Sequence, residues 1–112
     1  MDKPTAITVF ESLASSVRLD VFRLLVQQGP QGLVAGEIAA ALDLPATNLS
    51  FHLKALTQSG LLAVTQEGRF QRYRANMALM SDLIGSLTDE CCGGHPEACL
   101  RPNAAPVCTE CP

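Results

Sequence analysis

The first 90 residues of this chain contain no cysteine, and the whole chain of 112 residues contains no tryptophan and a single tyrosine. No apolar run approaches the roughly 18 residues that a membrane-spanning helix needs. Residues 1–16 also lack the basic start and the continuous apolar stretch of a signal peptide. These absences argue against a membrane protein and against a secreted disulfide framework. We therefore expect one soluble cytoplasmic domain whose thiols stay mostly reduced.

Charge is unevenly distributed along the chain, although the net charge is only −3. Residues 45–74 carry four basic side chains against Glu67 alone, a net charge of +3, whereas residues 1–44 carry −2 and residues 75–112 carry −4. A localised basic patch matters more for binding phosphate than the total charge does. The central window is therefore the part of the chain expected to contact nucleic acid.

All five cysteines lie in the last 22 residues, at Cys91, Cys92, Cys99, Cys108 and Cys111. Free cysteine otherwise behaves as a small buried hydrophobe, so a chain that gathers its thiols at one end indicates soft-metal or redox chemistry. Residues 93–112 combine glycine and proline with no aromatic residue, and we expect them to be irregular. The sequence thus predicts a folded domain over residues 1–90 and a cysteine-rich sensing tail over residues 91–112.

Apolar residues at spacings of three and four predict four helices in the first part of the chain, at 5–14, 17–28, 33–42 and 48–58. The first helix is expected to bury Ile7, Phe10, Leu13 and Ala14. Ser15 or Ser16 can cap the second helix and Thr47 the fourth, because a side-chain oxygen there accepts from a free backbone N–H.

The period changes after Gly60, and a β-hairpin is expected to follow. Residues 61–65 and 69–75 predict two strands, joined by a tight turn with Gly68 at its tip. From Met77 the pattern returns to a helix with one apolar stripe, which Gly93-Gly94 ends. The order predicts a mainly α fold with a β-hairpin wing, a winged helix-turn-helix in which residues 34–42 and 47–58 form the helix-turn-helix unit.

Three segments resemble the ArsR family of bacterial metal-responsive repressors: Phe10–Leu19, Asn48–Leu56 with its Ser-x-His-Leu-x-x-Leu pattern, and Glu67–Tyr73 with its Gly-Arg wing. The resemblance covers about residues 8–87. It implies a repressor that binds operator DNA. Many arsenic-sensing members carry a Cys-x-Cys pair on the third helix, where this chain has Val34-Ala35-Gly36-Glu37. The family also places sensing cysteines at the last helix, and the tail of this chain fits that pattern.

The second helix of the helix-turn-helix unit is expected to lie in the DNA major groove. Its short polar and cationic side chains suit phosphate oxygens and base edges, and the arginines of the wing suit phosphate or the minor groove. The predicted DNA-binding residues are Thr47, Asn48, Ser50, His52, Lys54, Arg69, Arg72 and Arg74. Tyr73 is expected to pack the wing onto the body.

The thiols offer more than one ligand set. Cys91, Cys92 and Cys99 supply three soft donors without an obvious fourth, which suits trivalent As(III) or Sb(III). Zinc prefers four tetrahedral ligands, and Cys108-x-x-Cys111 with His95 or Cys99 is the alternative set. Cys108 and Cys111 as a thioredoxin-like catalytic pair lack the βαβ context, and we expect no enzymatic activity.

The sequence therefore predicts an arsenic- or antimony-responsive repressor that binds operator DNA as a homodimer. The two subunits are expected to be joined through their first and last helices. A small domain with a long apolar last helix gains from burying that helix against a second copy. The alternatives are a repressor that senses zinc, cadmium or thiol oxidation, and a metal-sequestering protein that uses the winged helix to bind other proteins.

Overall fold

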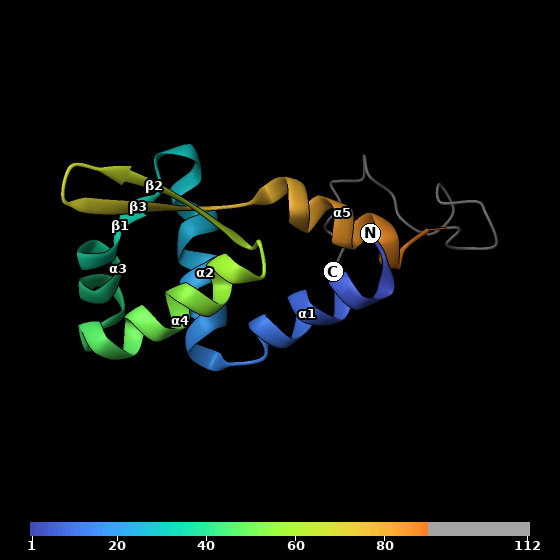
Figure 1. Cartoon of the computed structure of the whole chain (residues 1–112), viewed down its shortest axis with the longest axis horizontal. Helices are drawn as coiled ribbons and strands as arrows, with labels where there is room; N and C mark the ends of the chain where they lie inside the picture. The colour runs from blue at the N-terminus through green and yellow to red at the C-terminus, as the bar shows by residue number, and fades with distance from the viewer. Residues whose placement is uncertain (90–112) are drawn as a thin grey trace, which may run out of the picture. The chain divides into compact units, whose positions relative to one another are not determined.

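The computed structural model describes residues 1–89, and the five cysteines with the remainder of the predicted tail lie outside these residues. The elements run in the order α1 (Lys3–Leu13), α2 (Ser16–Gln28), η1 (Gly29–Gln31), β1 (Leu33–Val34), α3 (Ala35–Leu42), α4 (Ala46–Gln58), β2 (Leu62–Glu67), β3 (Phe70–Ala75) and α5 (Met77–Leu87) (Figure 1). This order confirms the expected winged helix-turn-helix fold. None of the helices within residues 1–89 is long and apolar enough to cross a membrane.

The helices and strands up to Ser81 form one compact unit, and a second unit begins at Asp82, partway along α5. In the first unit α2 contacts α3, α4 and β3, so the second helix is central to the domain. The side chains of this core are Val9, Val21, Phe22, Leu25, Ile38, Leu49, Leu53, Leu56, Leu61, Leu62 and Tyr73.

The sheet has three antiparallel strands in the order β1-β3-β2. Leu62 of β2 pairs with Ala75 and Glu67 pairs with Phe70, which confirms the hairpin, and Gly68 turns it with a φ of 64°. The prediction that the third helix starts at residue 33 is wrong, because Leu33 pairs with Tyr73 of β3 and forms β1. The helix starts two residues later, where the Glu37 carboxylate accepts from the Val34 N–H at 3.0 Å.

Two helix starts test the capping predictions. Ser15 caps α2, since its hydroxyl oxygen accepts from the Arg18 backbone N–H at 3.4 Å. The prediction for the fourth helix is wrong, because α4 begins at Ala46 with Pro45 as its cap residue. The ring of Pro45 fixes its φ at −62°. Because proline has no polar side-chain atom, the helix starts without a side-chain cap, and Thr47 lies in its first turn.

The first helix buries a different face from the one that its apolar spacing predicts. Val9 and Ser12 are buried, whereas Ile7 is 48% and Phe10 is 44% exposed. Because contacts with α2 and α4 decide which face of α1 is buried, Ile7 and Phe10 of the predicted stripe stay exposed and Leu13 is only half-buried.

Candidate nucleic-acid interface

The helix α4 presents a mixed polar and aromatic face away from the core. Leu49, Leu53 and Leu56 are at most 2% exposed and pack it into the domain, as their spacing predicts. The predicted base- and phosphate-contacting side chains Thr47, Asn48, Ser50 and Lys54 are all exposed on α4. These four residues can therefore meet a ligand without any rearrangement of the fold.

His52 is the exception among the predicted residues of α4, because it is half-buried and already bonded. The Arg18 Nε donates to His52 Nδ1 at 3.1 Å, so this ring nitrogen is an acceptor within the protein. This bond joins α2 to α4 across 34 residues of sequence. His52 thus has one ring nitrogen engaged inside the protein.

Phe51 is a residue of this face that the sequence reasoning missed. Its side chain is 66% exposed, the most exposed large apolar side chain in residues 1–89. The Arg18 guanidinium carbon lies 5.8 Å from the ring centroid, and the His52 ring meets it edge to face at 5.6 Å. An aromatic residue between polar neighbours on an outward helix face was the signal that could have revealed it.

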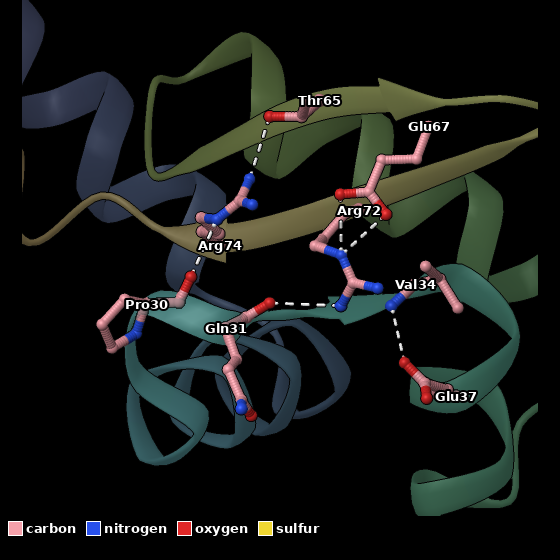
Figure 2. Close-up of polar contacts among 8 residues, drawn as sticks. All are labelled: Pro30, Gln31, Val34, Glu37, Thr65, Glu67, Arg72 and Arg74. Carbon is pink, nitrogen blue, oxygen red and sulfur yellow. Dashed lines mark hydrogen bonds and ion pairs between the residues drawn. The ribbon is translucent and has the colours of Figure 1, made fainter.

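The wing arginines divide into a free one and two engaged ones. Arg69 is exposed beside the hairpin tip and forms no hydrogen bond or ion pair within residues 1–89. Arg72 Nε lies 3.0 Å from the Glu67 carboxylate while its Nη1 donates to the Gln31 carbonyl at 3.2 Å (Figure 2). Arg74 Nε donates to the Pro30 carbonyl at 2.9 Å and its Nη1 to Thr65 Oγ1 at 2.9 Å.

Arg72 and Arg74 therefore share one face of β3 and tie the wing to the Gly29–Gln31 segment (Figure 2). Both residues are half-buried and Glu67 offsets the charge of Arg72, so the hairpin is fixed to the body and keeps a net charge of +2 from its three arginines and Glu67. Tyr73, between them, is buried at 8% exposure and its hydroxyl donates to Gln71 at 3.0 Å, which confirms its packing role. Burial raises the pKa of Tyr73 above the usual value of 10.0.

The carboxyl end of α4 is joined to two other elements by hydrogen bonds. Ser12 of α1 donates to Ser59 Oγ at 2.9 Å, and Ser59 donates in turn to the Leu56 carbonyl. Asn76 donates to the Gly60 carbonyl at 2.8 Å and accepts from the Leu79 N–H at 3.2 Å, which caps the start of α5. We call residues 59–61 the junction, because α1 and the start of α5 both bond to it.

The predicted metal ligands cannot be placed, since Cys91, Cys92, Cys99, Cys108 and Cys111 lie outside the described residues. Within residues 1–89, no three His, Cys, Asp or Glu side chains gather where they could hold a metal ion. Glu37, at the position of the third-helix pair, instead caps α3.

Comparison with known proteins identifies the scaffold. Residues 13–65 match the family described as "Helix-turn-helix domain". A homodimeric winged helix-turn-helix DNA-binding domain of Mb0332 from Mycobacterium bovis, described as a possible ArsR-family transcriptional regulator, is 30% identical, with 78% of this chain and 81% of that chain covered and a TM-score of 0.61.

HlyU from Vibrio cholerae N16961 is 26% identical, with 78% of this chain and 97% of that chain covered and a TM-score of 0.62. An ArsR-like transcriptional regulator from Rhodococcus sp. RHA1 is 24% identical over 86% of this chain and 93% of that chain, and its TM-score of 0.64 shows the shared fold. No curated protein matches the chain.

Proposed function

Since the chain belongs to the ArsR family of winged-helix transcriptional regulators, we propose that it is a repressor that binds operator DNA as a homodimer. Release from the operator follows when As(III) or Sb(III) binds thiolates in residues 91–112. A regulator of this kind works on DNA in the cytoplasm, where its thiols remain reduced.

The observation that carries the DNA-binding part is the outward face of α4. Thr47, Asn48, Ser50 and Lys54 are exposed on one helix whose opposite side is fixed by three core leucines. A helix held in this way can enter the major groove without losing contact with the core. The hairpin adds the positive charge of its arginines, which suits the phosphate backbone beside the groove.

Uncovered apolar side chains support the dimer. Ile7 and Phe10 of α1 are each more than 40% exposed. On α5, Ile84 is 53% and Leu87 is 62% exposed. Burying such side chains against a second copy is favourable, at about 25 cal/mol per Å² of apolar surface. A two-fold dimer then sets its two α4 helices about 34 Å apart, one turn of DNA.

The junction is the route that we propose for the signal from the tail to α4. Residues 91–112 begin four positions after the end of α5 in the sequence, and the start of α5 is bonded through Asn76 to Gly60, just after α4. A ligand that alters α5 can shift α4 only if it binds the released form more tightly than the DNA-bound form. A coupling of about 1–3 kcal/mol weakens DNA binding roughly 5–150-fold.

The ligand assignment rests on the donor set. Cys91, Cys92 and Cys99 give three soft thiolates, the number that a trivalent arsenical takes, whereas zinc and cadmium favour four-coordinate sets that draw on Cys108 and Cys111. Thiol oxidation would use the same residues without a metal. Release by arsenite but not by zinc, cadmium or peroxide is the pattern expected.

DNA binding is tested first with duplexes selected from a random-sequence library by the reduced protein. We expect a palindromic consensus and an affinity, followed by fluorescence anisotropy, that falls steeply with salt concentration. Tight arsenite uptake by a protein that selects no consensus would instead favour the metal-sequestering alternative.

Lys54→Gln should lower affinity for specific and random duplexes alike. Each subunit loses one phosphate contact, so the slope of log K against log salt should become shallower by about 2 for the dimer. Lys3→Gln, which removes a positive charge from α1 instead, is the matched control and should leave the slope unchanged. Equal slopes for both variants would show that Lys54 does not contact a phosphate in the complex.

Asn76→Ala tests the junction. The substitution removes a bond to Gly60 and a cap of α5, so we expect operator affinity without ligand to change little and the arsenite-induced loss of affinity to shrink about 2–30-fold. Thr8→Ala, which removes a hydroxyl bond within α1, is the control. A full arsenite response in the Asn76→Ala protein would mean that the signal takes another route.

A further inference from the structure

Phe51 is an aromatic side chain on the outward face of α4, the face that we propose to contact DNA. At 100° per residue, Phe51 lies about 170° around the α4 axis from the mean direction of the three core leucines. Thr47 and Lys54 lie about 40° and 60° from Phe51 on the same side of it, whereas His52 lies only about 70° from the core direction and is correspondingly half-buried. Phe51 therefore projects almost directly away from the core leucines, as Gln58 does at the end of the helix, and Phe51 is the large apolar side chain in that direction.

An exposed phenylalanine at that position has few favourable partners in DNA. Its ring has no hydrogen-bond donor or acceptor, so it cannot pair with phosphate oxygens or with the polar edges of bases. The major groove offers one apolar group, the C5-methyl of thymine, and phenylalanine is among the side chains that contact it. Burying that methyl group against the ring removes apolar surface of both partners from water.

Two neighbours hold the ring in place before any ligand arrives. The Arg18 guanidinium lies 5.8 Å from the ring centroid, and the His52 ring meets it at an interplanar angle of 71°. Arg18 also donates to His52 at 3.1 Å, so the three side chains restrain one another. A restrained ring loses little freedom on binding and can discriminate between bases by shape.

We propose that Phe51 reads a thymine in each half of the operator by contact with its C5-methyl group. This inference rests on the proposed DNA-binding function and adds a specificity determinant to it. Arg18, which acts on the ring, is a positioning residue.

The test replaces thymine by deoxyuridine, which removes only the methyl group, at each thymine pair of the selected palindromic duplex. For the unaltered protein we expect one symmetry-related pair at which the replacement weakens binding about fourfold per half-site, the effect of losing one buried methyl group. Phe51→Ala should bind the thymine and deoxyuridine duplexes equally at that pair. Because the change is made in the DNA, the main comparison does not depend on the stability of a variant.

Phe70→Ala is the matched control, since Phe70 is similarly exposed, at 59%, but lies on the wing. It should keep the fourfold dependence on the methyl group. The inference is overturned if no thymine position is sensitive, if Phe51→Ala remains sensitive, or if Phe51→Ala changes the oligomeric state in sedimentation because a second copy covers the ring. Failure to select any duplex would overturn the DNA-binding function itself, which is a distinct result.

Discussion

Gly32→Ala is expected to cost more than about 4 kcal/mol of folding free energy, a large share of the roughly 5–15 kcal/mol that stabilises a typical domain. A Cβ atom on Gly32 would collide with the carbonyl oxygen of Tyr73 and come within 2.8 Å of the Arg74 Cγ. Gly32 also has φ 58° and ψ −164°, a region that only glycine adopts readily. The loss should appear in urea denaturation followed by far-UV circular dichroism.

Gly29→Ala is the control that separates the collision from the backbone strain. Gly29 has φ 69° and ψ −149°, close to the values of Gly32, but a Cβ there meets nothing within 4 Å. We expect a loss of about 1–3 kcal/mol from the backbone alone. If the two variants were equally stable, close packing of β3 on the Gly32 backbone would not be what requires glycine there.

The second large effect is expected from the paired replacement of Cys91 and Cys92 by serine. Serine offers no soft donor to As(III), so the variant should keep its operator affinity and lose the 5–150-fold weakening by arsenite. The measurement is operator anisotropy at fixed arsenite in the presence of a reductant that does not chelate arsenic. Cys99→Ser should show the same loss if three thiolates are required.

Replacing Cys108 and Cys111 by serine is the matched control for this prediction. These residues lie in the same segment of chain but outside the proposed set of three donors, so the arsenite response should persist. If their replacement removes the response as completely as that of Cys91 and Cys92, the three-donor assignment is wrong and a larger site must replace it.

Local sequence patterns were sufficient to predict the helix-turn-helix unit and the wing. Leu49, Leu53 and Leu56 repeat at helical spacing, and burial of all three confirms the face of α4 that the spacing predicts. The hairpin follows from the change of period after Gly60 and from a glycine that tolerates positive φ at its tip. These features depend on residues close together in the chain.

Features that depend on distant partners could not be predicted in this way. The bonds of Arg72 to Gln31 and of Arg74 to Pro30 join residues 41 and 44 positions apart, and no local pattern predicts them. Leu33 forms a strand only because Tyr73 passes beside it. The apolar spacing in α1 predicted the helix correctly. It did not predict which face is buried, because contacts with other helices leave Ile7 and Phe10 outside the core.

Phe51 illustrates the same limit within the candidate site. An apolar side chain on a helix is usually assigned to the core, and only its exposure of 66% in the folded chain places Phe51 on the outward face. Its contact with Arg18 joins two helices that the sequence separates by more than one element. The polar residues around it were identified because their chemistry alone suits DNA.

The most direct test is to titrate arsenite into a preformed complex of the reduced full chain with its selected operator, while following anisotropy. The account predicts that the complex dissociates as arsenite saturates the protein, with operator affinity falling at least about fivefold. An operator complex that binds arsenite and keeps its full affinity would contradict it.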